Sequence, residues 1–228
     1  MNILAFDTSS KALSVALFAD ETLLGEITIN VKKNHSISLM PSIDYLVATC
    51  DLTPKDLDRI VVAQGPGSYT GLRVAVATAK TLAYALKIDL VGVSSLAALT
   101  DVAFDGLVVP VMDARRNNVY VGFYENGQSI SPDRHASFES VLEEVKGREK
   151  VIFVGEVASF TQQIEEVMPH ALIQETLPSA KLLVELGRNK DAEDVDAFLP
   201  NYLKRVEAEE NWLKNNEATG QADYIKRV

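Results

Sequence analysis

The chain opens with Asn2-Ile3-Leu4-Ala5-Phe6-Asp7-Thr8-Ser9-Ser10, an apolar run that ends in an acidic, hydroxyl-rich turn. A second apolar run covers residues 13–18, and a third covers residues 23–31. Short apolar runs separated by small polar turns are typical of β-strands joined as hairpins. The first thirty residues therefore predict a three-stranded meander.

The same pattern returns in the second half of the chain. Placing Asp7 on Asp113, an offset of 113 − 7 = 106, puts residues 15–18 on residues 121–124 without a gap. A second ungapped match joins residues 60–63 to residues 151–154 at an offset of 91. Two matches in the same order predict an internal duplication, in which the second copy is 106 − 91 = 15 residues shorter. We expect the loss to fall in the third strand or the first helix.

The turn dipeptide Asp105-Gly106 marks the predicted boundary between the copies. We expect a first domain over residues 1–105 and a smaller second domain over residues 106–203. The last segment, 204–228, is highly charged and has one apolar anchor at Trp212-Leu213. It is expected to form a solvated tail or a loosely docked helix.

Two helices are predicted in the first half, over Ser36–Cys50 and Thr70–Lys87. The second carries charges only at positions 73, 80 and 87, and its other residues are apolar, small or hydroxyl-bearing. A helix that is apolar nearly all round is buried on two sides. One side can pack on a sheet, while the other needs either the first helix or a second protein. We expect a partner-binding surface here, with complete burial inside the chain as the alternative.

Charge and composition exclude several classes of protein. The 228 residues include 22 basic and 32 acidic ones, so the net charge is 22 − 32 = −10, which disfavours binding of nucleic acid by this chain alone. A single cysteine, Cys50, excludes an intramolecular disulfide and a sulfur-based zinc site. There is no long uncharged apolar stretch and no basic leader. We expect a cytoplasmic protein without a membrane partner.

Two segments are candidates for binding an anion. The turn Asp7-Thr8-Ser9 resembles a phosphate-binding hairpin, although an ordinary polar turn explains the same residues. The loop from Gly65 through Gly67 to Gly71 opens a helix, where backbone amides can bind an anion, but a tight strand-to-helix turn is an equal alternative. His35, His135 and His170 lie too far apart in sequence for a paired-histidine motif, so no metal site is predicted.

Four segments resemble the TsaB family, whose older name is YeaZ. They are Asn2 to Ser10, Gly65-Pro66-Gly67-Ser68-Tyr69-Thr70-Gly71-Leu72-Arg73, Gly92-Val93-Ser94-Ser95-Leu96 and Asp113-Ala114-Arg115-Arg116. The resemblance implies an α/β actin/Hsp70-like (ASKHA) ATPase fold made of two duplicated ribonuclease-H-like domains. It also implies a non-catalytic role in making threonylcarbamoyladenosine at position 37 of tRNA. Asn118 stands where family members often have Glu.

The same resemblance implies the partners. The TsaD paralogue would carry the metal and transfer the threonylcarbamoyl group, and the TsaE ATPase would join the complex. ATP and metal are therefore expected on partner subunits, with tRNA contacted indirectly. The chain would pair with TsaD, or with itself when alone, through the two helices of the first domain. The interface residues expected from this are Leu39, Met40, Ile43, Val47, Leu72, Arg73, Val74, Ala77, Thr78, Thr81 and Ala85.

Two other functions remain open from the residues. An ATP-binding enzyme of the actin-like class would use Asp7 and the loop at Gly65. A weaker alternative is a glycoprotease-like peptidase, although the sequence supplies neither paired metal-binding histidines nor a Gly-x-Ser-x-Gly nucleophile motif.

Overall fold

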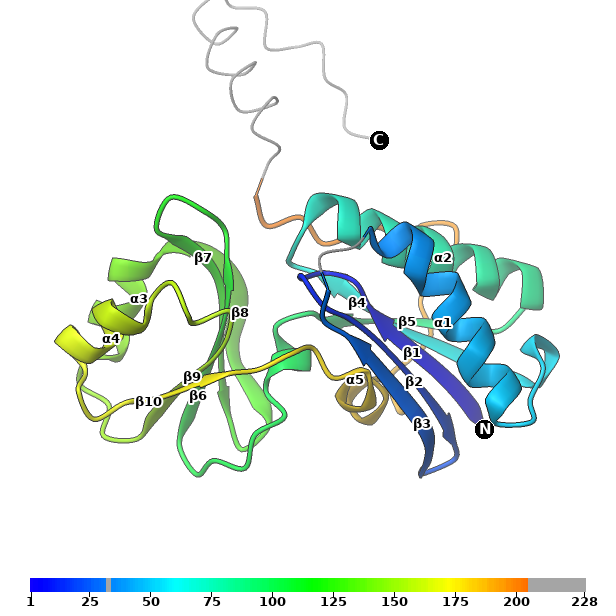
Figure 1. The fold of residues 1–228 in the computed structure, drawn as a ribbon, viewed down its shortest axis with the longest axis horizontal. Helices are drawn as coiled ribbons and strands as arrows, with labels where there is room; N and C mark the ends of the chain where they lie inside the picture. The colour runs from blue at the N-terminus through cyan, green and yellow to red at the C-terminus, as the bar shows by residue number, and fades with distance from the viewer. Residues whose placement is uncertain (32–33, 205–228) are drawn as a thin grey trace, which may run out of the picture.

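The computed structural model describes residues 1–31 and 34–204, which form two five-stranded sheets with the same strand order (Figure 1). The first sheet runs β3-β2-β1-β4-β5, and the second runs β8-β7-β6-β9-β10. In each, the first three strands are antiparallel and the last two lie parallel to the first. The prediction of a duplicated actin-like α/β fold is confirmed.

The elements of the first half are β1 (Asn2–Asp7), β2 (Leu13–Ala19), β3 (Thr22–Ile29), α1 (His35–Thr49), η1 (Pro54–Asp56), β4 (Arg59–Gly65), α2 (Tyr69–Leu86), β5 (Asp89–Ser94) and η2 (Ala97–Leu99). Those of the second half are β6 (Leu107–Asp113), β7 (Asn118–Glu125), β8 (Gln128–Ser137), α3 (Phe138–Val145), β9 (Val151–Gly155), α4 (Thr161–Val167), β10 (Leu172–Glu175) and α5 (Ala180–Gly187).

Helices α1 and α2 cover one face of the first sheet. Side chains at every second position of β1 and β2 point into this layer, as the period of a strand requires. They meet a stripe on each helix, with Leu39 and Ile43 from α1 and Ala75 and Ala79 from α2. The small α2 side chains let the helix lie close to the sheet. Helices α3 and α4 cover the second sheet in the same way.

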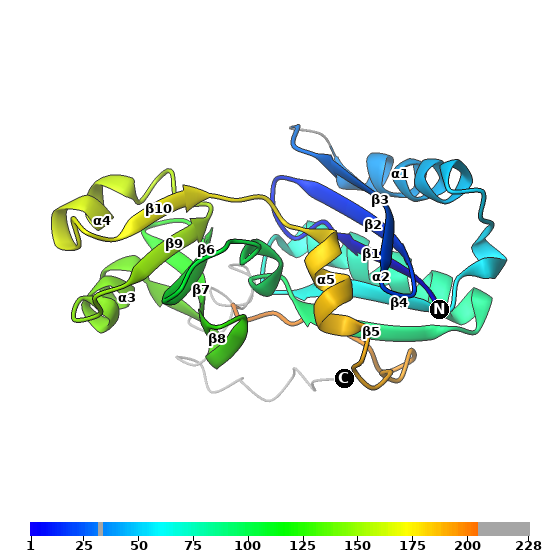
Figure 2. The ribbon, with the colours of Figure 1, turned by 90° about the horizontal axis from the view of Figure 1, so that it is seen from below.

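Helix α5 covers the opposite face of the first sheet (Figures 1 and 2). Its Leu183 and Val184 pack on Ile3, Ala5 and Val61 in a core that also includes second-sheet residues. The chain then stays with the first sheet, because Glu193 N donates to Leu90 O and Asn201 N donates to Gln64 O. The end of the segment predicted as the second domain, from Ala180 onward, thus packs on the first sheet.

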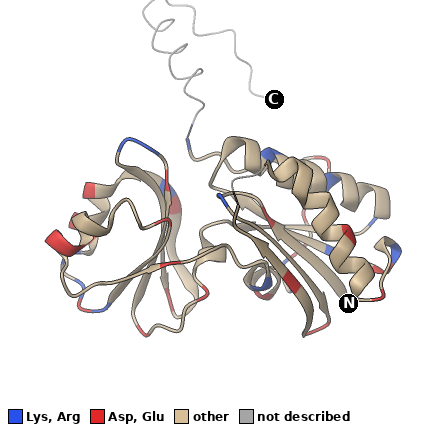
Figure 3. Cartoon of the chain, viewed as in Figure 1, with Lys and Arg blue, Asp and Glu red and all other residues tan. Residues whose placement is uncertain are grey.

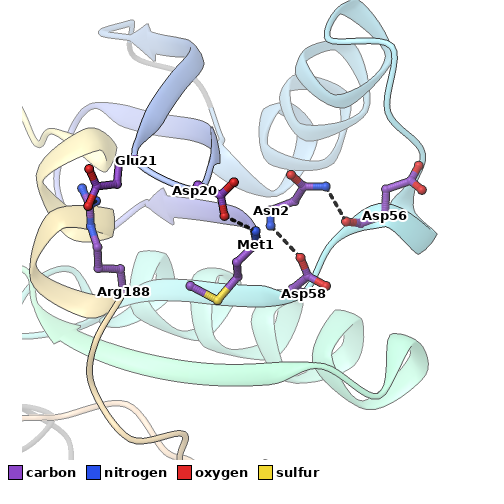
Figure 4. Close-up of polar contacts among 7 residues, drawn as sticks. All are labelled: Met1, Asn2, Asp20, Glu21, Asp56, Asp58 and Arg188. Carbon is purple, nitrogen blue, oxygen red and sulfur yellow. Dashed lines mark hydrogen bonds and ion pairs between the residues drawn. The ribbon is translucent and has the colours of Figure 1, made fainter.

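Polar contacts fix the start of β1 at the edge of this core (Figure 4). The Met1 ammonium pairs with Asp20, and Asn2 N donates to Asp58 Oδ2 at 2.6 Å. The side-chain amide of Asn2 (Nδ2) also donates to Asp56 O. These contacts join the first hairpin to the segment that leads into β4.

The predicted loss in the second copy falls in the first helix, which has 8 residues in α3 against 15 in α1, while the third strand is kept. The second helix is shorter as well, with 7 residues in α4 against 18 in α2. The ungapped match of Asp7 with Asp113, however, is wrong by one residue. Phe6 points toward α1 and α2, whereas Met112, its partner at offset 106, points away from α3 and α4. The two aspartates also differ in burial, since Asp7 is buried and Asp113 is exposed.

The predictions made for Trp212-Leu213 and the rest of the charged tail fall on residues 205–228, which lie outside the described part of the chain.

Candidate functional site

The predicted phosphate-binding turn is sealed inside the protein. Asp7 and Thr8 are fully buried, and Ser9 is 1% exposed. The loop between β4 and α2 lies directly on them, because Ser68 N donates to Ser9 O at 2.7 Å and Thr8 Oγ1 donates to Gly71 O at 2.7 Å. The two anion-site candidates therefore pack against each other.

Two glycines of the loop make this close packing possible. A Cβ on Gly71 would stand 2.0 Å from Thr8 O, and one on Gly67 would stand 2.4 Å from Ser9 O. Both obstacles are backbone atoms that cannot move aside. Of the two interpretations of this loop, the tight turn accounts for Gly67 and Gly71 through their contact with the first hairpin.

The Asp7 carboxyl is electrostatically unusual. Its Oδ1 accepts a hydrogen bond of 2.6 Å from Ser9 N, while its Oδ2 has no hydrogen-bond partner among the described residues. Burial raises the pKa of Asp7 to about 6, and the Ser9 hydrogen bond and nearby His35 offset this only in part.

A shallow groove of about 480 Å³ lies between the N-terminal parts of α1 and α2. Its α1 wall has Leu39 and the 45% exposed Met40, and its α2 wall has Val74, Ala77 and Thr78. Tyr69 and Arg73 close one end, where the Arg73 guanidinium lies 5.3 Å from the centre of the Tyr69 ring. The groove is thus apolar along its length and cationic at one end.

Apolar side chains on these two helices remain exposed beyond the groove. Ile37 on α1 is 71% exposed and Tyr84 on α2 is 72% exposed, and Tyr45 is 64% exposed. Figure 3 shows both helices as largely uncharged against a molecule that carries charges on most other elements. Exposed apolar area gathered on neighbouring helices is a common mark of a protein-binding surface.

The structure separates the predicted interface residues into two groups. The residues that reach the surface of α1 and α2 are Met40, Arg73, Val74, Ala77, Thr78, Thr81 and Ala85. The other four, Leu39, Ile43, Val47 and Leu72, are at most 5% exposed and belong to the interior of this chain, although Leu39 also lines the floor of the groove. In this chain they form the stripes that hold α1 and α2 on the sheet, and only Leu39 among them also borders the groove.

A second cavity, of about 560 Å³, lies in the cleft between the two halves. Lys11 and Ser9 come from the first hairpin, Arg115 from the β6–β7 turn, and Lys204 from the end of the described chain. The sequence identifies Arg115 only as part of a family motif and does not predict Lys204 as its neighbour. No local signal joins residues so far apart in sequence.

The β6–β7 turn has an unusual backbone. Arg115, Arg116 and Asn117 are three successive non-glycine residues in the left-handed region, with φ of 67°, 54° and 57°. Each such residue costs about 1 kcal/mol. The Asn118 amide offsets part of that cost by donating to the carbonyl oxygens of Arg115 and Arg116. A glutamate at 118 has no donor for this task.

Metal-binding clusters and membrane-spanning helices are both absent from the described residues. No three histidine, cysteine or carboxylate side chains within 1–31 and 34–204 converge to hold a metal ion. Among the helices of the same residues, none is both long and apolar enough to cross a membrane.

Comparison with known proteins agrees with this architecture. Residues 22–212 match the family model described as TsaD, tRNA N6-adenosine threonylcarbamoyltransferase. The Bacillus subtilis tRNA threonylcarbamoyladenosine biosynthesis protein TsaB is 41% identical over 95% of this chain and 100% of its own length. The Haemophilus influenzae TsaB is 26% identical over 94% of each. A Pseudomonas aeruginosa structure, described as similar to the peptidase YEAZ, has a TM-score of 0.78 at 25% identity and covers 89% of this chain and 99% of its own.

The repeated sheet order and the helices on matching faces define an actin-like fold of two ribonuclease-H-like halves. Within that class the near full-length similarity is decisive: the chain belongs to the TsaB family of tRNA threonylcarbamoyladenosine biosynthesis proteins. The family suggested by the sequence motifs is confirmed.

Proposed function

We propose that this chain is a non-catalytic scaffold subunit of the complex that transfers a threonylcarbamoyl group to N6 of adenosine 37 of tRNA. Its task is to bind and stabilise a catalytic paralogue of the TsaD type. The observation that carries this proposal is the apolar groove and exposed helical surface of α1 and α2, in a chain whose family is named for this modification.

The α1–α2 surface suits a helical partner. Ala77, Thr81 and Ala85 are exposed on successive turns of α2, so a facing helix can approach the backbone closely. Large apolar side chains such as Ile37 and Tyr84 flank this stripe of small residues. A second copy of this chain offers the same surface, so we propose a homodimer when the paralogue is absent.

The sealed turn supports a non-catalytic role. Asp7 is the only carboxylate of the predicted phosphate-binding turn, and the loop from Gly65 to Gly71 covers it. An actin-like ATPase needs that turn open to the phosphates of its nucleotide. On this proposal the metal belongs to the TsaD paralogue and the ATP to the TsaE ATPase or to the interface between subunits.

The test is a pair of substitutions that each add one negative charge to an exposed helical position. Ala77→Glu changes the wall of the groove, and Gln162→Glu changes α4 in the other half. We expect Ala77→Glu to weaken association with the TsaD paralogue at least tenfold, because a carboxylate must then be desolvated in an apolar contact. Gln162→Glu should have no effect. The measurement is the dissociation constant, with the mass in solution of each chain alone.

Two results would contradict the scaffold role. One is equal binding of the paralogue by Ala77→Glu and Gln162→Glu. The other is tight binding of Mg²⁺-ATP by the isolated chain together with an activity that Asp7→Ala abolishes, which would favour the actin-like ATPase instead.

A further inference from the structure

The cleft between the two halves has a local charge opposite to that of the whole molecule. The chain carries a net charge of −10, yet three cationic side chains, Lys11, Arg115 and Lys204, line this one cavity. Neither Lys11 nor Arg115 has an acidic partner among the described residues, and both are exposed. Their charges are available to a ligand.

The two acidic side chains in the cleft, Asp113 and Glu156, each accept a hydrogen bond from the backbone of the cleft wall. Asp113 Oδ1 accepts a hydrogen bond of 2.7 Å from Arg115 N, and Glu156 Oε2 accepts one of 2.9 Å from Asp113 N. These carboxylates fix the strained turn that presents Arg115. The Gln163 side chain also donates a hydrogen bond to Asn117 Oδ1 in the same turn. The backbone that carries Arg115 is therefore fixed by these hydrogen bonds.

An aromatic pair adjoins the same cleft through one of its members, Tyr69. The rings of Tyr69, which lines the cavity, and Tyr202 are 5.0 Å apart, and each residue is about two-fifths exposed, at 43% and 42%. The Arg73 guanidinium lies over the Tyr69 ring, and its Nη1 donates to Tyr69 Oη at 3.2 Å. Exposed aromatic rings beside cationic side chains are the combination that binds single-stranded nucleic acid, because bases stack and phosphates pair with the charges.

We propose that this cleft binds the backbone of RNA, with Lys11, Arg115 and Lys204 contacting phosphates and the Tyr69–Tyr202 pair stacking on an unpaired base. Ser9 forms part of the cavity wall, but its hydroxyl is buried, so the phosphate contacts of this proposal rest on the three exposed or half-exposed cations. The chain would then contact tRNA directly, and Tyr69 would lie where this cleft meets the end of the α1–α2 groove.

The cleft suits RNA better than its competitors. A free nucleotide would need the Asp7 turn, and the loop from Gly65 to Gly71 covers that turn. An acidic peptide would pair with the cations but would leave the exposed tyrosine pair unused. RNA uses both features.

The test measures binding of an unmodified tRNA transcript to the full chain by fluorescence anisotropy at low and at moderate salt. The cleft variant carries Lys11→Glu and Arg115→Glu. Its control carries Lys55→Glu and Lys190→Glu, two exposed lysines with no acidic side-chain partner among the described residues. Both have the net charge −10 − 4 = −14.

We expect the cleft variant to bind tRNA at least tenfold more weakly than the control. Its salt dependence, the slope of log K against log salt, should fall by about 0.7 to 0.9 for each phosphate that the variant no longer binds. Tyr202→Ala should weaken the binding of a single-stranded oligonucleotide more than the binding of a duplex. The affinity of a Lys11→Gln, Arg115→Gln chain for tRNA should lie between that of the wild type and that of the cleft variant. Thermal unfolding of each chain checks that it is folded.

Equal losses of affinity in the cleft and control variants would overturn the proposal, since general repulsion would then explain both. It would also be overturned by wild-type binding of ADP or of a polyglutamate peptide in the cleft in preference to tRNA. The scaffold proposal is judged separately, because Ala77→Glu should leave tRNA binding by the isolated chain unchanged.

Discussion

Asp7 shows how a residue typical of a phosphate site can be retained without an open site. Its carboxyl is enclosed by its own turn and by the loop that precedes α2, and one of its oxygens has no hydrogen-bond partner among the described residues. Keeping the ionised form in this place costs free energy, which is why burial raises the pKa of Asp7 to about 6 from a reference value of 3.8.

This pKa predicts a specific dependence of stability on pH. The folded state binds more protons at Asp7 than the unfolded state does between pH 4 and 6, so the contribution of Asp7 to the free energy of unfolding falls as the pH rises through this range. A shift from 3.8 to about 6 corresponds to roughly 3 kcal/mol. Asp7→Asn cannot ionise and should lack this decline. Urea unfolding from about pH 4 to about pH 7.5 measures the difference between the two chains.

Other acids titrate in the same range, which makes the difference between the chains the informative quantity. Burial also raises the pKa of Asp133, but that group is common to both. Parallel stability curves for wild type and Asp7→Asn would show that the Asp7 carboxyl is hydrated in solution, contrary to the structure.

The sequence located the site residues but not their packing. Asp7-Thr8-Ser9 and the loop at Gly65 were both identified as anion-site candidates, and each does form a turn. Their mutual contact depends on β1 and β4 being neighbours in the sheet, and strand order is a tertiary property. For the same reason the buried residues Ile43 and Leu72 could not be distinguished from surface ones, because a helix apolar on two sides gives no periodicity to separate its faces.

At the scale of elements, α2 is held by the first sheet, by α1 and by a segment near the end of the described chain. It packs on β4 and β5, it lies beside α1, and it contacts residues 194–201, a segment we call the strap. Lys80 Nζ donates to the strap carbonyl oxygens of Asp196 and Phe198, each at 2.9 Å. The sequence predicted a polar strip on α2 through Lys80, but its partners lie more than a hundred residues away and left no local signal.

Lys80→Met should therefore release the strap while preserving most of the apolar stem. Two charge-assisted hydrogen bonds to partly exposed carbonyls are removed, so we expect a destabilisation of about 1–3 kcal/mol. The Asn201 amide, which donates to Gln64 O, should exchange its hydrogen faster because it lies in the same segment. Urea unfolding and amide exchange measure the two effects.

The matched control is Lys55→Met, an exposed lysine with no side-chain hydrogen bond among the described residues. It should change stability by less than about 0.5 kcal/mol. If Lys80→Met behaves like this control, the strap is held by Phe198 in the core and not by the lysine.

Element positions were predicted more closely than their connections. The helices expected over 36–50 and 70–87 are found at His35–Thr49 and Tyr69–Leu86, because caps and apolar spacing are local signals. Helix α5 lies within the segment that the sequence assigns to the second domain, yet it covers the first sheet. Nothing in its own residues tells which sheet it covers, since its apolar stripe fits either.

At the scale of the whole molecule, the two halves share one core between them. Side chains of the first sheet, of α5 and of β6, β7 and β9 form a single buried cluster. Thr176 Oγ1 donates to Leu99 O, and Ser179 N donates to Ala98 O, so the chain re-enters the first half beside η2. The first sheet is thus completed by residues from the far end of the sequence.

This arrangement predicts that residues 1–105 cannot fold alone, although they contain the whole first sheet. Without α5, the face formed by Ile3, Ala5, Val61 and Val93 is open to water. An uncovered apolar sheet face of this size favours aggregation or a loosely packed state. We expect the 1–105 fragment to bind a hydrophobic dye and to lack a near-ultraviolet circular dichroism signal.

A rescue chain separates this explanation from a general effect of truncation. Residues 177–204 joined to 1–105 by a short Gly/Ser linker restore α5 and the strap, and the linker need only span from the end of the first fragment to the neighbourhood of Leu99. We expect this chain to regain near-ultraviolet circular dichroism and a cooperative urea transition, while Leu183→Asp in the same chain abolishes both, because an unpaired carboxylate would enter the core. A cooperative transition in 1–105 alone would mean that the first half carries a complete core without α5, and the shared cluster would then be a docking contact between independent domains.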